Sequence, residues 1–297
     1  MKFLRIGEPG EERPVVLNDS GRAFDLSPLV ADIDGDFFAT ETFLRARQAL
    51  ADGTLPDLGW ELTADQLETR TPSGERIGAP IARPGNIICV GMNYAAHARE
   101  SGAEPPKTPV VFLKPANTIA GPYDNAPIPP GAKKYDWEVE LGIVIGKHAS
   151  YLNSAEEATA VIAGYVAAND LSEREYQLPG EAGQWTKGKS LPYSTPVGPF
   201  LVPSSEVDGE NLACRSWING EIRQDSNTAD FIFDIPTMVQ HLSQYMLLEP
   251  GDLILTGTPE GVALSGRFPY ITDGDVGEFE IDQLGRQRQS YYQLVTQ

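Results

Sequence analysis

The chain has 297 residues, of which 41% are hydrophobic, so it can form one large domain or a large domain with a small one. Its 23 basic and 42 acidic residues give a net charge of −19 at pH 7, which disfavours nucleic acid and anionic membranes as partners. No run of about 18 apolar residues occurs, so no membrane-spanning helix is expected. Any site for an anionic substrate needs local positive charge from lysine, arginine or a metal ion.

The cysteine content predicts the compartment. Cys89 and Cys214 lie in apolar or mixed segments and are too few for a disulfide framework. We therefore expect both to be reduced core residues and the protein to be cytoplasmic. Residues 1–7 become polar too soon to form a signal peptide.

Residues 1–75 are predicted to form a small β-rich domain, because short strand-like pieces alternate there with turn signals. Residues 14–17 are apolar and are followed by Asn-Asp-Ser-Gly at 18–21, which is typical of a hairpin. A polar stretch runs from residue 51 to residue 78, and a linker is expected near residues 70–82.

The main domain is predicted to span residues 76–297. Apolar segments separated by glycine and proline predict strands at residues 85–91, 110–113, 138–145, 162–168 and 252–255. Helices are expected at residues 94–101, 154–160 and 235–245. This pattern predicts an α+β fold that is mainly β.

The strand predicted at residues 138–145 carries two carboxylates. Glu138 and Glu140 are two residues apart, so they share one face of the strand. Among apolar residues they would repel each other and lose hydration, and a divalent cation would remove both costs. An edge strand with a solvated acidic face explains the pattern equally well.

Asp170 follows the strand predicted at residues 162–168 and precedes a stretch, residues 171–177, that is expected to be helical. An aspartate in this position is usually a turn residue or a helix cap, and locally this interpretation is favoured. If Asp170 joins Glu138 and Glu140, the three carboxylates form a hard oxygen site. Such a site suits Mg²⁺ or Mn²⁺, whereas Zn²⁺ would prefer His or Cys.

His97 and Glu100 are three residues apart in a predicted helix, so they lie on one face and can form a hydrogen-bonded pair. A carboxylate beside an imidazole raises its basicity and orients it as a general base. A surface ion pair is the more common meaning of this spacing.

Residues 183–190 match the phosphate-loop pattern GxxxxGK[ST], which requires a preceding strand and a following helix. A polar stretch precedes the match, and two prolines after it forbid a regular helix, so we reject nucleotide binding. Lys189 remains a candidate site lysine. Residues 256–262 follow a predicted strand and could line an anion pocket or form a plain turn.

Together these segments resemble the fumarylacetoacetate hydrolase family. The resemblance is carried, in the family's order, by residues 91–94 with His97 and Glu100, and by residues 136–141, 169–174, 188–190 and 256–262. It implies a mixed β-sandwich or roll with flanking helices, usually dimeric, and a Mg²⁺ or Mn²⁺ ion held by Glu138, Glu140 and Asp170.

The resemblance also implies roles for other residues. His97 and Glu100 would form a catalytic pair on a segment that orders over bound ligand, and Lys189 would be the site lysine. Arg174, Gln177 and Thr258 would contact substrate oxygens. Residues 191–194 read Leu-Pro-Tyr-Ser where members often have a Phe-Asp-Thr-Phe-like run, so the resemblance does not define the details of the substrate pocket.

Residues 1–7, 25–27 and 183–190 are similar to a subgroup that contains 2,4-diketo-3-deoxy-L-rhamnonate and -L-fuconate hydrolases. We therefore expect hydrolysis of a carbon–carbon bond in a small anionic 2,4-dioxo acid, giving pyruvate and a carboxylic acid. His97 would take a proton from the attacking water. Alternatives are an oxaloacetate decarboxylase or related lyase or dehydratase, a non-catalytic acidic-metabolite binding protein, and a nucleotide-binding protein.

Overall fold

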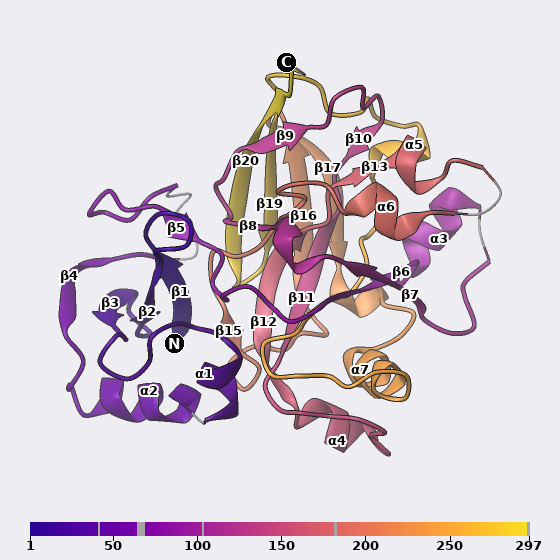
Figure 1. The fold of residues 1–297 in the computed structure, drawn as a ribbon. Helices are drawn as coiled ribbons and strands as arrows, with labels where there is room; N and C mark the ends of the chain where they lie inside the picture. The colour runs from indigo at the N-terminus through magenta and orange to yellow at the C-terminus, as the bar shows by residue number, and fades with distance from the viewer. Residues whose placement is uncertain (41, 64–68, 103, 181–182, 296–297) are drawn as a thin grey trace.

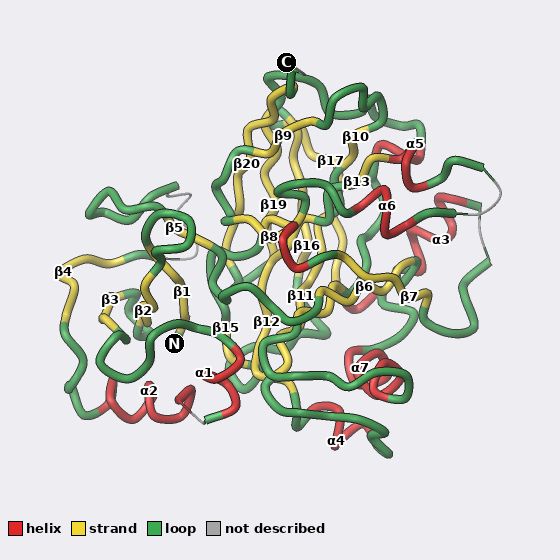
Figure 2. Tube along the Cα trace, in the orientation of Figure 1, coloured by secondary structure: helices red, strands yellow, loops and turns green. Residues whose placement is uncertain are grey.

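The computed structural model describes residues 1–40, 42–63, 69–102, 104–180 and 183–295 (Figure 1). A small N-terminal unit lies beside a larger body that consists mainly of long strands. The helices are short and lie mostly around these strands (Figure 2). Within the described ranges, no helix has the length and apolar composition needed to cross a membrane.

The N-terminal unit contains a five-stranded antiparallel sheet in the order β4-β3-β2-β1-β5. Its strands are β1 (Lys2–Ile6), β2 (Arg13–Leu17), β3 (Arg22–Asp25), β4 (Asp57–Glu61) and β5 (Ile77–Gly78). The predicted hairpin is confirmed, because β2 and β3 pair around the turn at residues 18–21. Two helices, α1 (Gly35–Ala39) and α2 (Thr42–Ala51), occupy a region for which the sequence predicted only strands and turns.

The domain boundary after residue 75 stays a prediction. β5 follows it at once and completes the N-terminal sheet by pairing with β1. Residues 64–68 of the predicted polar stretch lie outside the described residues.

The larger body is built on a six-stranded mixed sheet in the order β15-β12-β11-β18-β6-β7. Its strands are β6 (Ile87–Gly91), β7 (Val110–Lys114), β11 (Val139–Ile145), β12 (Ile162–Asn169), β15 (Val202–Pro203) and β18 (Leu253–Leu255). All five strands predicted for the main domain from apolar runs therefore belong to this one sheet. β18 and β6 are parallel, and the other neighbours are antiparallel.

A second sheet packs against one face of the first, because β11 and β12 contact β16, β19 and β20. Its order is β17-β16-β19-β20-β9, with β9 (Ala126–Ile128), β16 (Ala213–Ile218), β17 (Glu221–Asn227), β19 (Val276–Ile281) and β20 (Gly285–Gln293). Leu141 and Ile143 of β11 share a core with Phe279 and Ile281 of β19. The result is a β-sandwich.

The outer face of the six-stranded sheet packs against the N-terminal unit. Val144 and Val166 lie in one apolar cluster with Phe3 and Phe37. Because strand side chains alternate, Glu138 and Glu140 are on this outer face with Val144. The N-terminal unit covers one part of the face, and the carboxylates lie farther along it.

The helices of the larger body are α3 (Ala95–Ser101), α4 (Ala155–Thr159), α5 (Arg174–Gln177), α6 (Trp185–Lys189) and α7 (Ile235–Ser243). The predicted helices at residues 94–101, 154–160 and 235–245 are confirmed as α3, α4 and α7. The helix expected at residues 171–177 is shorter than predicted, since residues 172–173 form β13 (Ser172–Glu173), which pairs with β10 (Tyr135–Asp136). Another two-stranded sheet joins β8 (Ile119–Ala120) and β14 (Thr195–Pro196). The predicted α+β, mainly β class is confirmed.

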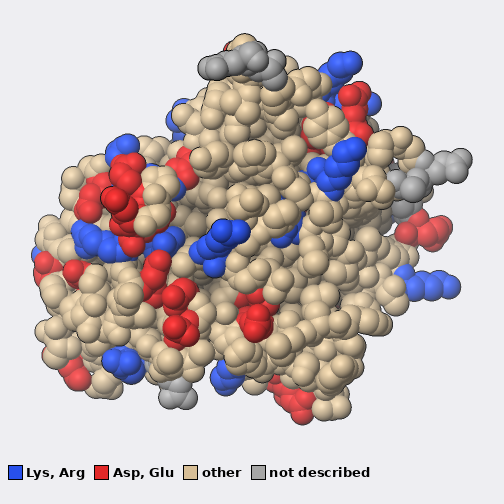
Figure 3. Space-filling model, viewed as in Figure 1, with Lys and Arg blue, Asp and Glu red and all other residues tan. Residues whose placement is uncertain are grey.

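Charged side chains of both signs are interspersed on the face shown in Figure 3. Acidic and basic groups gather over the N-terminal unit at the left of the view. Among the described residues drawn there, no broad basic patch is visible.

Candidate active site

The sheet register brings three carboxylates together. Val139 pairs with Asn169 in the β11–β12 ladder, and the amide of Asp170 donates to the carbonyl of Glu138 at 2.9 Å. Asp170 therefore lies opposite Glu138, with Glu140 on the same face. Oxygens of Glu138, Glu140 and Asp170 lie within 4.8 Å of one another, and all three residues are buried. A solvated edge and a simple helix cap are thus excluded as explanations of these residues.

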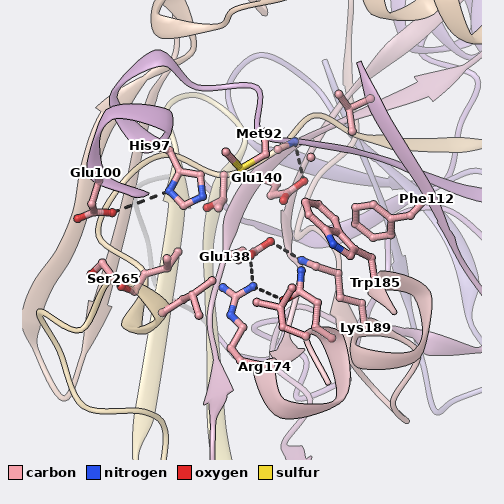
Figure 4. A pocket seen from close by; sticks show the side chains of 18 residues that line it. Met92, His97, Glu100, Phe112, Glu138, Glu140, Arg174, Trp185, Lys189 and Ser265 are labelled. Atoms are coloured by element: carbon pink, nitrogen blue, oxygen red, sulfur yellow. Dashed lines mark hydrogen bonds and ion pairs between the residues drawn. The ribbon is translucent and has the colours of Figure 1, made fainter. Parts of the chain in front are cut away.

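Three cationic side chains surround the carboxylates, and two of them, Arg174 and Lys189, are drawn beside Glu138 in Figure 4. Lys189 Nζ lies 2.5 Å from Glu138 Oε2 and 2.6 Å from Asp170 Oδ2. A guanidinium nitrogen of Arg174 lies 2.7 Å from Glu138 Oε1, and the ammonium group of Lys114 contacts Asp170 Oδ1. Direct pairing of opposite charges offsets the free-energy cost of burying these ionised groups.

Two members of this network were missed by the sequence analysis. Lys114, at the end of β7, is fully buried and also donates to the carbonyl of Ser194. Asp136 in β10 accepts a bond from Arg174 Nε at 2.8 Å and is completely buried. For Lys114 the available signal was an ionisable residue at the end of an apolar segment, and for Asp136 it was its place in the segment 136–141 that carries the family resemblance.

Lys189 reaches the carboxylates because helices α5 and α6 pack closely. A Cβ added to Gly188 would lie 2.4 Å from Cβ of Gln177, so this contact requires glycine. Helix α6 ends at Lys189, whereas a phosphate loop would begin its helix near this residue. The arrangement is therefore not a phosphate loop; residues 181–182, just before the matched pattern, lie outside the described residues.

The charges around the carboxylates shift their pKa values in opposite directions. Burial alone would raise the pKa of Glu138, but the charges of Lys189 and Arg174 outweigh it and lower the pKa to about 2. Burial, together with the negative charges of Asp170 and Glu138, raises the pKa of Glu140. Glu140 is thus the carboxylate that most lacks positive charge.

His97 and Glu100 of α3 lie on the opposite side of the cavity from Lys189 (Figure 4). The distance from His97 Nδ1 to Glu100 Oε2 is 3.8 Å, so the predicted hydrogen bond is not formed. Glu100 instead accepts bonds from the amide of Gly261 at 3.0 Å and from Arg267 at 2.9 Å. Burial lowers the pKa of His97, which favours the neutral imidazole that a general base needs.

These groups line a cavity of about 440 Å³, which is large enough for a small metabolite. Its lining includes all the predicted site residues except Asp170: His97, Glu100, Glu138, Glu140, Arg174, Gln177, Lys189 and Thr258. Apolar side chains, among them Met92, Leu178 and Leu264, form much of the remaining wall.

The three residues predicted to contact substrate differ in how many of their hydrogen-bonding groups lack a protein partner. One guanidinium nitrogen of Arg174 is buried without a hydrogen-bond partner, so it can still donate to a ligand. The side-chain oxygen of Gln177 accepts a bond from Arg174 at 2.8 Å. The hydroxyl of Thr258 donates to the carbonyl of Val139 and accepts from Gln224, so its hydrogen is already used.

The donor set fits a hard divalent cation. Three carboxylates converge from two neighbouring strands, and the described residues of this cluster include no thiolate or imidazole ligand. Burial, together with the negative charges of Asp170 and Glu138, raises the pKa of Glu140, and such an ion would offset both causes. Glu138, Glu140 and Asp170 could therefore hold Mg²⁺ or Mn²⁺.

We expect Asp136→Asn to destabilise the fold by about 3–5 kcal/mol, because it removes one partner of a buried ion pair. Asp136 also accepts bonds from the amides of Ala263 and Leu264, which the amide group of asparagine would satisfy only in part. Urea unfolding followed by circular dichroism measures the change. Asp225→Asn is the matched control, since Asp225 is 67% exposed in its pair with Arg215, and we expect a change within about 0.5 kcal/mol. Equal effects of the two substitutions would contradict a structural role for Asp136.

Comparison with known proteins places this chain among enzymes. Residues 86–290 match the family model described as fumarylacetoacetate (FAA) hydrolase, C-terminal. A Burkholderia multivorans protein is 42% identical over 97% of this chain and 98% of its own length. Its name describes a hydrolase and gives no substrate.

Solved structures have the same fold. The 5-carboxymethyl-2-hydroxymuconate delta-isomerase from Mycobacterium smegmatis matches with a TM-score of 0.75 and 31% identity, covering 100% of both chains. Maleylpyruvate hydrolase from Sphingobium sp. SYK-6, in complex with manganese(II) and pyruvate, matches with a TM-score of 0.77 and 27% identity over 99% of each chain. The predicted resemblance is confirmed at the family level, and the sugar-acid subgroup stays a prediction.

Proposed function

Because this chain belongs to the fumarylacetoacetate hydrolase family, we propose that it hydrolyses a carbon–carbon bond of a 2,4-dioxo acid to give pyruvate and a carboxylic acid. The observation that carries the proposal is the buried triad of Glu138, Glu140 and Asp170 beside a cavity that Lys189 also lines. The complex of maleylpyruvate hydrolase with manganese(II) and pyruvate supports both the metal and the product class. The substrate class comprises acylpyruvates and 2,4-diketo-3-deoxy sugar acids.

The proposed cofactor is Mg²⁺ or Mn²⁺, held by Glu138, Glu140 and Asp170. When bound, it would supply Lewis acidity toward the oxygens of a 2-oxo acid. Lys189 and the free guanidinium nitrogen of Arg174 would offset the negative charge of the substrate, which the net charge of −19 otherwise repels. Gln177 and Thr258 would border the bound substrate and help to orient it.

His97 is the proposed general base. Its buried, unpartnered Nδ1 lies close enough to Glu100 that a small movement of the carboxylate would complete the hydrogen bond. The imidazole would then take a proton from the water that attacks the C4 carbonyl. A separate movement of α3, which carries both residues, over bound substrate would exclude bulk water.

Decarboxylation of oxaloacetate is the second candidate. It would use the same carboxylates and the same lysine but would need no attacking water. The 3.8 Å separation of His97 and Glu100 favours it, because the base is not oriented in this arrangement.

We further propose a cytoplasmic homodimer that binds neither nucleic acid nor membrane, in keeping with the sequence-based expectation.

A substrate panel tests the function directly. Acylpyruvates, oxaloacetate and diketo-deoxy sugar acids would be assayed with Mg²⁺ and with Mn²⁺, and we expect metal-dependent release of pyruvate from at least one dioxo acid. Thermal unfolding provides a second measurement: magnesium plus oxalate should raise the melting temperature, and magnesium plus ATP should not. Metal-dependent binding of oxalate without turnover of any substrate would favour a binding protein, and stabilisation by ATP would favour a nucleotide site.

A further inference from the structure

Cationic groups already engage every carboxylate oxygen of Glu138 and Asp170. Arg174 pairs with Oε1 of Glu138, and Lys189 pairs with Oε2. On Asp170, Lys114 pairs with Oδ1 and Lys189 with Oδ2. The ammonium group of Lys189 therefore lies between two of the three proposed metal ligands, at hydrogen-bond distance from both.

A divalent cation needs these same oxygens. Glu140 has no ion-pair partner among the described residues, but one of its oxygens already accepts a bond from the amide of Gly257 at 2.9 Å. Glu140 by itself therefore offers too few oxygen ligands to hold the ion. Coordination by Glu138 and Asp170 would place the ion next to the Lys189 ammonium, where like charges repel strongly in a buried site. Movement of one of the three cationic side chains would relieve this repulsion.

The surrounding contacts identify the cation that is free to move. Lys114 is anchored by the carbonyl of Ser194, and its side chain is fully buried. Arg174 is anchored by Asp136 and by Gln177. Among the described residues, Lys189 Nζ has hydrogen bonds to the two carboxylates and to no other group, and Lys189 lines the cavity.

We propose that Lys189 is a tethered counter-ion of the carboxylate site, and that a divalent cation displaces its ammonium group into the cavity. This inference rests on the metal site of the proposed function. The displaced ammonium would meet an anionic substrate there. Nζ already lies 5.3 Å from the centroid of the Phe112 ring, and this ring lines the cavity, so the ring could stabilise the ammonium group in both positions. Metal binding would thus prepare the cavity for an anion as well as supply the ion itself.

Chemical labelling of the wild-type protein tests the displacement without any substitution. The protein would be methylated with formaldehyde and a borane reductant, with EDTA or with Mn²⁺, and its peptides analysed by mass spectrometry. We expect Lys189 to be protected in EDTA and methylated at least about tenfold more with Mn²⁺. Lys114 should stay protected in both, and exposed Lys147 should be labelled in both.

Mn²⁺ affinity provides an independent measurement, by calorimetry of wild type, Lys189→Met and Lys114→Met. Loss of a competing cation should tighten Mn²⁺ binding on the order of tenfold more in Lys189→Met than in Lys114→Met, because Lys189 pairs with two of the proposed ligands and Lys114 with one. Mn²⁺ binding with Lys189 still protected, or equal affinity changes in the two variants, would overturn the displacement and leave the proposed function standing. Failure of Mn²⁺ to bind the wild type at all would overturn both.

Discussion

Glu140→Gln should strongly reduce metal-dependent turnover and at the same time stabilise the metal-free protein. The substitution keeps the shape of the side chain but removes one of three anionic ligands. Lewis-acid stabilisation by a bound ion contributes several kcal/mol, so we expect a loss on the order of 10³ in kcat/KM. Steady-state kinetics with Mn²⁺ measures this loss, and calorimetry shows whether Mn²⁺ still binds.

The stability gain has a defined pH dependence. Burial and two neighbouring carboxylates raise the pKa of Glu140 above its ordinary value of 4.5, so the folded state holds this proton more tightly than the unfolded state does. Stability of the wild type therefore falls as pH rises from 4.5 toward the folded pKa, because the folded state binds more protons in that window. The Gln variant has no such proton, so its advantage should be absent below pH 4.5 and grow above it.

Urea unfolding in EDTA across this pH range would measure the advantage. Glu221→Gln, at a position that is 74% exposed, is the matched control and should change neither stability nor turnover appreciably. A Gln variant that is less stable than wild type at neutral pH would contradict the claim that Glu140 carries unbalanced charge. Addition of Mn²⁺ should stabilise the wild type more than the variant.

Local rules could predict only part of the carboxylate triad. Spacing by two placed Glu138 and Glu140 on one face, and an apolar segment ending at Asp170 placed that residue at a strand end. The pairing of β11 with β12, which brings Asp170 opposite Glu138, is a long-range fact that only the family resemblance supplied before the structure. Local sequence alone favoured a cap for Asp170.

Partners far apart in the chain account for what was missed at the site. Lys114 ends an apolar strand, and nothing near it in sequence indicates Asp170 as its partner. Glu100 was expected to bind His97 because the two share a helix face, but Gly261 and Arg267 compete for the same carboxylate. Spacing along a helix shows which side chains can approach each other. It does not show whether groups from other segments form the hydrogen bonds instead.

The N-terminal helices α1 and α2 were not predicted, although the sequence features that favour them are local. Asp34 caps α1 by accepting a bond from the amide of Phe37, and residues 42–51 are rich in Leu, Arg, Ala and Gln, which favour helix. Turn residues are frequent around these two helices, and they led to a prediction of strands and turns for the whole of residues 1–75. The five strands predicted in the main domain contain apolar runs, and the three helices predicted there became α3, α4 and α7. The strands of the second sheet were not predicted, because buried and partly exposed positions alternate in β16, β19 and β20 and no apolar run marks them.

His97→Ala should separate hydrolysis from decarboxylation. Both reactions build negative charge on the 2-oxo oxygen, and only hydrolysis needs a base to activate water. We therefore expect a loss of about 10²–10⁴ in hydrolysis of an acylpyruvate and a much smaller loss in any decarboxylation of oxaloacetate. Parallel assays of the two reactions on one preparation measure the ratio, and His148→Ala, at an exposed position, is the matched control.

Glu100→Gln should show the same selectivity in weaker form, since it keeps the shape of the side chain but removes the charge that raises the basicity of His97. The pH profile adds a second criterion. Because burial lowers the pKa of His97, the imidazole stays neutral below its ordinary value of 6.5, and hydrolysis should fall only as pH drops below that value. Equal loss of both activities in His97→Ala would mean that the pair has a role other than activating water, such as holding α3 over the bound ligand.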